Sequence, residues 1–215
     1  MSITAKICGI KTPEALNAAL QSGAAYVGLV FFPKSPRNVT IAAGAALADQ
    51  ARGKAKIVAL VVDADDAALA NIVETVRPDF LQLHGRESPA RVQAVKKLFG
   101  VPVIKAISVS NAADAAGADA YRDIADLILF DAKAPKGSEL PGGNGLAFDW
   151  RALEDQRASL FMLSGGLTPE NVSGAIRATG AQTVDVSSGV ESAPGFKDAE
   201  MIRRFLHAVK LAKQT

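Results

Sequence analysis

The sequence predicts a single α/β domain, residues 1–215, folded as a (β/α)8 barrel of the TIM type. Short apolar segments alternate along the chain with longer, alanine-rich amphipathic segments, and this alternation is typical of a parallel sheet covered by helices. The apolar segments number eight, so each repeat has about 27 residues, which fits a closed eight-stranded barrel. Helix start and stop signals stand between these segments.

The eight segments expected as strands are short and apolar almost throughout, as strands buried on both faces are. In chain order they are residues 5–10, 25–31, 55–62, 80–85, 101–109, 126–132, 159–166 and 182–189. Helices are expected between them, with examples at residues 12–23, 65–76, 88–100 and 168–180. Ser or Thr before Pro at their starts, and Gly at their ends, favour helix boundaries. An open, doubly wound sheet is the alternative, but the count of eight and the absence of G-x-G-x-x-G after the first strand favour the barrel.

The composition argues against several classes of function. The chain has 24 basic and 22 acidic side chains, a balance that does not favour an extended nucleic-acid surface. No segment approaches the roughly 20 apolar residues that span a bilayer, and the N-terminus lacks the apolar core of an export signal. We therefore expect a cytoplasmic protein with no membrane partner. One cysteine forms no intramolecular disulfide, and two histidines leave few soft ligands, so we expect no metal site.

Two loops that follow strand ends are longer than tight turns. They are residues 32–40 after the second strand and residues 133–149 after the sixth. The carboxyl ends of barrel strands carry the active site, and long Gly- and Pro-rich loops there often serve as lids. We expect residues 133–149 to form a mobile lid, with an ordered surface excursion as the alternative.

The loops after the seventh and eighth strands are the usual phosphate-binding place of a barrel. "SGGLTPEN" at 164–171 leaves the seventh strand through two glycines, and we expect Thr168 to cap a helix with Pro169 in its first turn. "DVSSGVE" at 185–191 leaves the eighth strand where a short extra helix has room to begin. Backbone N–H groups and helix N-termini favour a phosphate dianion, with tight-turn chemistry as the alternative. The two loops contain Gly165, Gly166, Ser187, Ser188 and Gly189.

Polar or reactive side chains stand at several strand ends, where the catalytic groups of barrels lie. They are Cys8, Asp63, His84 and Asp131, together with Arg37 in the loop after the second strand. Each also has an ordinary explanation, such as burial as a small hydrophobe for Cys8 or a helix cap for Asp63. His84 would then be a satisfied hydrogen-bonding group, and Asp131 would pair with Lys133.

The combination of these side chains favours acid–base chemistry. Cys8 and Asp131 end strands that are not neighbours, so they can face each other across the mouth of the barrel. A thiolate acts as a base near neutral pH where positive charge lowers its pKa, and a carboxylic acid donates a proton where burial raises its pKa. Arg37 offers a planar fork for a second anionic group, most naturally a carboxylate. Four polar residues within the strands are expected to pair into a supporting network, namely Lys6, Gln82, Lys105 and Asp185.

Six segments carry a more specific pattern. In chain order they read "KICGI" at the first strand, "GLVFFPKSPRNV" at 28–39, "LQLHG" at 81–85, "LFDAK" at 129–133, "LSGGLTPENV" at 163–172 and "VDVSSGVE" at 184–191. In sequence and in order they resemble the motifs of the phosphoribosylanthranilate isomerase family of tryptophan biosynthesis. The resemblance spans nearly the whole chain and implies a small phosphorylated substrate and no cofactor.

The resemblance also implies an Amadori rearrangement, in which the phosphoribosyl amine of anthranilate becomes the open-chain 1-amino-1-deoxy ketose phosphate. By position, Asp131 matches the family's general acid, which protonates the ribose ring oxygen to give a Schiff base. Cys8 matches the general base, which removes the proton from the second carbon of the sugar. Arg37 matches the residue that meets the anthranilate carboxylate, and the two glycine-containing loops match the phosphate site. His84 lies in a family motif without an assigned role.

Two other functions are the alternatives. The first is a phosphoribosyl isomerase of the histidine pathway. The scheme of that family has two aspartates as acid and base, whereas the first strand here ends in Cys8. A barrel that binds a phosphorylated ligand or a flavin phosphate without turnover would not require Cys8 and Asp131 to face each other. We expect a monomer because the chain is small and self-contained, with a dimer through barrel loops as the alternative.

Overall fold

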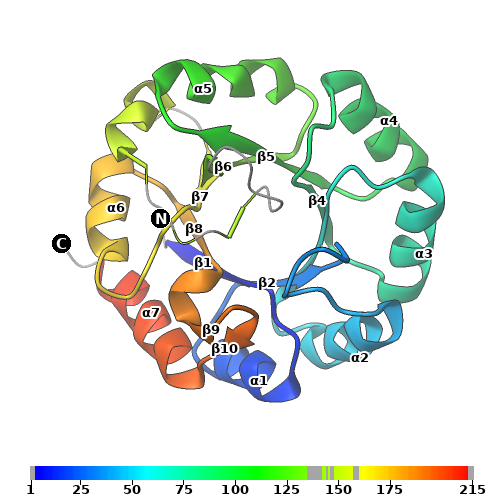
Figure 1. Ribbon diagram of the computed structural model, residues 1–215, viewed down its shortest axis with the longest axis horizontal. Coiled ribbons are helices and arrows are strands. Elements are labelled where there is room, and N and C mark those ends of the chain that lie inside the picture. Colours follow the sequence, from blue (N-terminus) through cyan, green and yellow to red (C-terminus); the bar gives the residue numbers. More distant parts are fainter. Residues whose placement is uncertain (1–2, 135–141, 144, 146–147, 157–159, 213–215) are drawn as a thin grey trace.

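The chain forms a closed barrel of eight parallel strands surrounded by helices (Figure 1). The computed structural model describes residues 3–134, 142–143, 145, 148–156 and 160–212. The strands follow one another in chain order, and β8 pairs with β1, so the ring closes and an open sheet is excluded. The barrel strands are β1 (Thr4–Cys8), β2 (Tyr26–Val30), β3 (Lys56–Val61), β4 (Phe80–Leu83), β5 (Val103–Val109), β6 (Leu127–Ala132), β7 (Phe161–Leu163) and β8 (Thr183–Val186). The predicted fold class is confirmed.

Helices connect the strands and cover the outside of the barrel (Figure 1). They are α1 (Pro13–Gln21), α2 (Ile41–Ala51), α3 (Asp66–Val76), α4 (Pro89–Phe99), α5 (Ala112–Ala116), α6 (Val172–Thr179) and α7 (Ala199–Leu211), with 3-10 helices η1 (Gly117–Tyr121), η2 (Trp150–Gln156) and η3 (Ser188–Val190). The side chains of Thr12 and Ser88 cap α1 and α4, each followed by the predicted proline. After β8, η3 is the short extra helix for which the sequence leaves room, and the hairpin of β9 (Glu191–Ala193) and β10 (Phe196–Lys197) follows it.

The helix predicted to begin at Thr168 begins four residues later, as α6 at Val172. The Thr168 backbone N–H donates to Asn171 Oδ1 at 2.8 Å, and Asn171 Nδ2 donates to the Gly166 carbonyl at 2.9 Å. These two bonds close a turn that precedes the helix, so Asn171 occupies the N-cap position and the prediction for Thr168 is wrong. The turn competes with the helix because Thr and Asn side chains bond readily to nearby backbone.

The buried side chains fall into two sets because successive residues of a strand point to opposite faces. Along β1, Ile7 packs into the apolar layer between barrel and helices, whereas Cys8 belongs to a separate cluster inside the barrel mouth with Val30 and Leu60. A further apolar layer fills the barrel interior and consists of Val58, Ile104, Ala106, Leu129 and Met162. The apolar interior therefore ends below a mouth that can hold polar chemistry.

Two buried ion pairs complete the interior. Lys6 Nζ lies 3.0 Å from Asp185 Oδ1, and Lys105 Nζ lies 2.8 Å from Glu87 Oε2. The expected pairing of Lys6, Lys105 and Asp185 is confirmed, whereas Glu87 was not predicted. Glu87 comes from the loop after β4, so its contact with Lys105 on β5 depends on how that loop folds against the strand. Removing one partner of such a pair leaves an uncompensated buried charge.

Acid is expected to destabilise the protein partly through Glu87. Burial opposes ionisation of this carboxyl, but Lys105 and hydrogen bonds to Glu87 outweigh it and hold its pKa below the ordinary value. A lowered pKa in the folded state contributes stability above the unfolded-state pKa of about 4.3, and this stability is lost as the pH falls through the folded-state pKa. Glu87→Gln should lower the free energy of unfolding at pH 7 by about 3 kcal/mol, and it should make the melting temperature less sensitive to acid. Thermal unfolding measured from neutral to acid pH checks this, and equal acid sensitivity of both proteins would contradict it.

Candidate active site

A pocket opens at the carboxyl ends of the barrel strands, where the sequence predicts the active site. Its lining includes all eight predicted site residues, which are Cys8, Arg37, Asp131, Gly165, Gly166, Ser187, Ser188 and Gly189. His84 also lines the pocket, and so do Gly142 and Gly143 from the loop after β6. The predicted lid at 133–149 lies largely outside the described residues. The fold thus gathers the predicted side chains around one space, although their chemical roles stay predictions.

Cys8 is at the end of β1 and only 4% exposed. Gly28 on β2 makes room for its sulfur, since a Cβ at Gly28 would lie 2.8 Å from Cys8 Sγ. Burial raises the pKa of Cys8 above the ordinary thiol value, and Asp185 adds to this, whereas Lys6 and Lys197 oppose it. The positive charge expected from the sequence is therefore present, but it does not bring the pKa below the ordinary value. Lys6 and Lys197 are the two groups whose positive charge favours the thiolate form of Cys8.

Asp131 lies at the end of β6 and is buried. Its Oδ2 is 3.1 Å from His84 Nε2, and His84 Nδ1 is 2.8 Å from Gln82 Nε2. The alternative pairing with Lys133 is wrong, because Lys133 pairs with Asp114 at 3.2 Å. His84 thus gains a role that its sequence position did not reveal, as the direct partner of Asp131. Within the described part of the chain, Gln82 Oε1 is buried without a hydrogen-bond partner.

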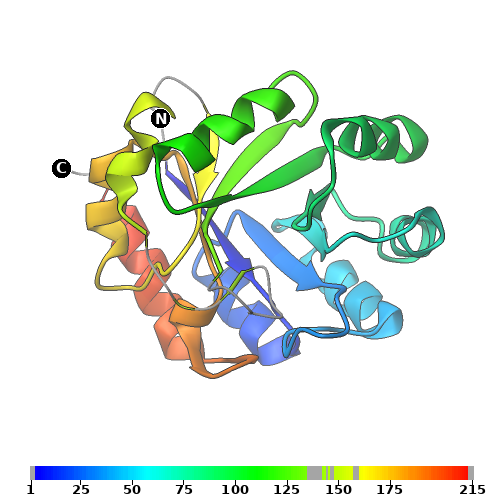
Figure 2. The same ribbon diagram turned by 45° about the horizontal axis from the view of Figure 1, so that its top comes forward.

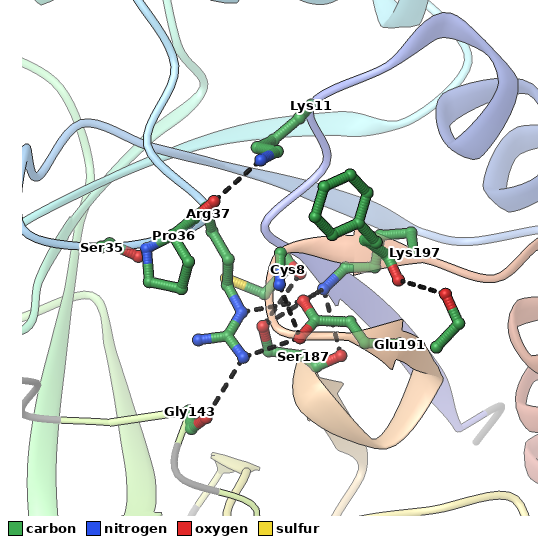
Figure 3. A network of polar contacts seen from close by, with 12 residues as sticks. Cys8, Lys11, Ser35, Pro36, Arg37, Gly143, Ser187, Glu191 and Lys197 are labelled. Carbon is green, nitrogen blue, oxygen red and sulfur yellow. Dashed lines mark hydrogen bonds and ion pairs between the residues drawn. The ribbon is translucent and has the colours of Figure 1, made fainter.

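Arg37 reaches the pocket from the loop after β2 and forms a two-pronged ion pair with Glu191 (Figure 3). Its Nε donates to Glu191 Oε1 and its Nη2 to Glu191 Oε2, both at 2.8 Å. Nη2 also donates to the Gly143 carbonyl at 3.2 Å, and Lys197 Nζ donates to Glu191 Oε1 at 2.5 Å. Such a fork holds the guanidinium in one plane. Glu191 and the Gly143 carbonyl therefore fix the orientation of the predicted anion-binding arginine.

Glu191 and Lys197 belong to the hairpin β9–β10, which lies beside α1 in both views of the ribbon (Figure 1 and Figure 2). Neither residue was predicted from the sequence. The available signal was a pair of opposite charges flanking "SAPGF" at 192–196, directly after the predicted phosphate loop. A short charged turn is common on protein surfaces, and only the folded chain shows that both side chains are buried.

The loops after β7 and β8 pack backbone against backbone at the predicted phosphate end. A Cβ at Gly189 would lie 1.8 Å from the Leu167 carbonyl oxygen, and a Cβ at Gly165, where φ is +89°, would lie 2.5 Å from the Ala132 nitrogen. Only glycine fits these two positions. The backbone N–H groups of Gly165 and Gly166 have no acceptor among the described residues. The pair of loops therefore presents backbone donors to the pocket, as a phosphate site requires.

Asp63 lies outside the pocket and serves the loops around it. Its backbone has φ +48°, its Oδ1 accepts from the Arg86 N–H at 2.7 Å, and its own N–H donates to Glu87 Oε1 at 3.0 Å. The helix-cap explanation is also wrong, because Asp65 caps α3 by accepting from the Ala68 N–H. Asp63 ties the loop after β3 to the loop after β4.

The described residues, 3–134, 142–143, 145, 148–156 and 160–212, contain neither a metal-binding cluster nor a membrane-spanning helix. In that part of the chain, no group of three or more His, Cys, Asp or Glu side chains is arranged to hold a metal ion. No helix among the same residues combines the length and the apolar character needed to cross a bilayer.

The model of the N-(5'-phosphoribosyl)anthranilate (PRA) isomerase family matches residues 5–208 of this chain. The chain belongs to this family. An N-(5'-phosphoribosyl)anthranilate isomerase of Bradyrhizobium sp. (strain ORS 278) is 55% identical to it over 215 residues, which cover 100% of this chain and 98% of that protein. The corresponding isomerase of Rhodopseudomonas palustris (strain BisA53) is 56% identical, over 100% of this chain and 99% of its own length.

Solved structures of PRA isomerases share the fold of this chain. The enzyme from Thermotoga maritima superposes with a TM-score of 0.87 at 35% identity, covering 97% of this chain and 98% of that one. A PRA isomerase in complex with reduced 1-(o-carboxyphenylamino)-1-deoxyribulose 5-phosphate superposes with a TM-score of 0.85 at 33% identity, over 97% and 98% of the two chains. The resemblance noted in the six sequence motifs is therefore confirmed at the level of the family.

Proposed function

We propose that Cys8 and Asp131 are the general base and general acid of an Amadori rearrangement in this PRA isomerase. The reaction of tryptophan biosynthesis converts N-(5'-phosphoribosyl)anthranilate to 1-(2-carboxyphenylamino)-1-deoxyribulose 5-phosphate. Asp131 donates its proton to the ribose ring oxygen, and the ring opens to a Schiff base. Cys8 then removes the proton from the second sugar carbon, giving an enolamine that tautomerises to the ketone. The observation that carries the proposal is that Cys8, on β1, and Asp131, on β6, line one pocket from strands that are not paired with each other.

The rest of the pocket supports one orientation of the substrate. The loops after β7 and β8 offer backbone donors to the phosphate, and Arg37 offers its guanidinium to the anthranilate carboxylate. These two anion sites lie in the same pocket as Cys8 and Asp131, so a substrate held at both ends places its sugar near the acid and the base. Holding the reacting groups in this way supplies much of the rate enhancement of an enzyme.

His84 is suited to hold Asp131 in both of its protonation states. A protonated carboxyl can donate to Nε2 of a neutral imidazole, and a carboxylate can accept from the same nitrogen when it carries the proton. The 3.1 Å contact between Asp131 Oδ2 and His84 Nε2 serves either arrangement. Gln82 contacts Nδ1 at 2.8 Å, and its amide has both a donor and an acceptor to match either tautomer. We infer that His84 and Gln82 keep the Asp131 carboxyl in place through the reaction.

The test is to generate phosphoribosylanthranilate in situ and to follow the loss of its fluorescence with the wild-type protein. Rapid loss that requires the enzyme is expected. Absence of turnover, together with retained binding of phosphorylated ligands, would instead favour a barrel that only binds such ligands.

Arg37→Ala is expected to raise KM about 10- to 100-fold, because a charge-assisted hydrogen bond to the substrate carboxylate is lost. Glu191 keeps Lys197 and the Gly195 N–H as partners, so the variant should still fold. Steady-state kinetics checks this, with Lys34→Ala, an exposed lysine of the same loop, as the control. An unchanged KM for Arg37→Ala would contradict the proposed carboxylate contact.

We further propose that the chain acts as a monomeric single domain in the cytoplasm. All the site residues named above come from one chain and surround one pocket, so the site does not need a second copy. The phosphoribosylanthranilate isomerase of Thermotoga maritima is a dimer from which monomers have been generated. Light scattering on the purified protein distinguishes the two states, and a stable dimer would contradict the proposal of a monomer.

A further inference from the structure

Lys197 is a buried cation in the mouth of the barrel that the rearrangement as written above does not use. Its side chain is 2% exposed, and its Nζ has three acceptors (Figure 3). These are Glu191 Oε1 at 2.5 Å, the Ser187 carbonyl at 3.1 Å and Ser187 Oγ at 3.3 Å. Three acceptors match the three N–H donors of an ammonium group. The position of this charge is therefore fixed from two elements, the hairpin β9–β10 and the end of β8.

The same contacts tie Lys197 to Cys8. Ser187 Oγ donates to the backbone carbonyl of Cys8 at 3.2 Å while it also accepts from Lys197. Figure 3 shows Cys8, Ser187 and Lys197 near one another, and all three belong to the same network of polar contacts. Burial raises the pKa of Cys8, and the ammonium of Lys197 opposes this rise. Burial also lowers the pKa of Lys197, and Glu191 and a negative Cys8 offset part of that shift. The two groups are thus electrostatic neighbours.

The charged side chains on the Lys197 side of Cys8 include more positive than negative charges. On the barrel side, Lys6 is matched by Asp185 at 3.0 Å. On the mouth side, Arg37 and Lys197 share the single carboxylate of Glu191, so this cluster keeps an excess of one positive charge. Across the pocket are His84 and Asp131, which pair with each other. An excess positive charge beside a thiol favours its thiolate form.

We propose that Lys197 is a positioning residue that stabilises the thiolate of Cys8 for proton abstraction, and that Glu191 and Ser187 hold its ammonium in place for this purpose. The proposal deepens the function proposed above and rests on Cys8 as the general base. It assigns a task to the hairpin β9–β10, which brings Lys197 and Glu191 to the mouth of the barrel. Lys6, with its own carboxylate partner, provides the barrel-side charge.

The first test titrates Cys8 directly in the ligand-free protein. Cys8 is the only cysteine, so thiolate absorbance in the ultraviolet and the rate of alkylation against pH both report this one group. Lys197→Met should raise the pKa of Cys8 by about one unit, since loss of a nearby opposite charge shifts a pKa by one unit or more. Lys197→Gln, which keeps hydrogen-bond donors for Glu191 and Ser187 but lacks the charge, should do the same.

Lys11→Met is the matched control. It removes one positive charge near the same mouth, but Lys11 donates to the Pro36 carbonyl at 2.8 Å and lies over the Phe196 ring. The titration of Cys8 in this variant should equal that of the wild type. Circular dichroism establishes that each variant is folded. A folded Lys197→Met or Lys197→Gln in which Cys8 titrates as in the wild type would overturn the proposal.

The second test uses the isomerase reaction. In Lys197→Met, the rise of kcat/KM with pH should move to higher pH by the same amount as the thiol titration. Turnover near neutral pH should then fall about tenfold, since one pKa unit changes the thiolate fraction tenfold. A loss of equal size at every pH would indicate a merely structural role and would overturn the proposal. The thiol titration needs no substrate, so it judges Lys197 even if the wild type shows no isomerase activity, which would instead contradict the proposed function.

Discussion

Cys8→Ala is expected to lower kcat about 100- to 10,000-fold, the range that removal of a general base produces. Without the thiol, no other side chain at the end of β1 can take the proton from the second sugar carbon. The fold should remain intact, because Cys8 has apolar neighbours, Val30 and Leu60, and alanine removes only one heavy atom. The loss of substrate fluorescence measures the effect. A rate within a few-fold of the wild type would eliminate Cys8 as the base.

The pH dependence of the wild type gives an independent check on Cys8. Burial, the largest contribution, raises the pKa of this thiol, so the thiolate forms above the ordinary thiol range in the ligand-free site. A base must be deprotonated to act, and kcat/KM should therefore rise as the pH increases toward the raised pKa. In Cys8→Ala the remaining activity should lack this rise. A wild-type profile that falls over the same range would contradict the assignment.

Asp131→Asn is expected to lower kcat by a similar factor, about 100- to 10,000-fold, because an amide has no acidic proton to give to the ring oxygen. Asparagine has nearly the same shape and can still bond to His84 Nε2, so the pocket should keep its geometry. Substrate affinity should change little, which separates a chemical defect from a binding defect.

Asp114→Asn is the matched control for this variant. Asp114 is a carboxylate near the same end of the barrel that does not line the pocket, although its partner Lys133 does. Its replacement is the same aspartate-to-asparagine change and should leave kcat within a few-fold of the wild type. If Asp131→Asn and Asp114→Asn had equal effects, Asp131 would not be the acid.

Much of the fold was predictable because its signals are local. Continuous apolar segments marked the strands, and the caps at Thr12 and Ser88 marked two helix starts, since a cap depends on residues three positions away. The prediction failed at Thr168 because a side chain from the same short segment, Asn171, closed a competing turn. Local preference alone does not decide between a turn and a helix when both satisfy the same backbone groups.

Some residues of the candidate site were likewise recognisable in the sequence, and others were not. Cys8 and Asp131 stood out because the carboxyl ends of barrel strands are recognisable in a sequence. The partners of the site residues were not recognisable: His84 for Asp131, Glu191 for Arg37, and Lys197 beside Cys8. Residues 37 and 191 are 154 positions apart, and they meet only because the chain returns to the mouth after the eighth strand.

By itself the sequence determined the number of barrel strands and their alternation with helices, the end of the barrel that carries the candidate site and the family of the enzyme. These follow from apolar periodicity, from turn residues and from motifs that each lie within about 12 consecutive residues. Only the tertiary structure decided which charges neutralise one another and what pKa the thiol of Cys8 has. Closure of the ring between β1 and β8 pairs Lys6 with Asp185, and the return of the hairpin β9–β10 to the mouth buries Glu191 and Lys197. In a buried site the energy of each charge depends on distances between segments that are far apart in the chain.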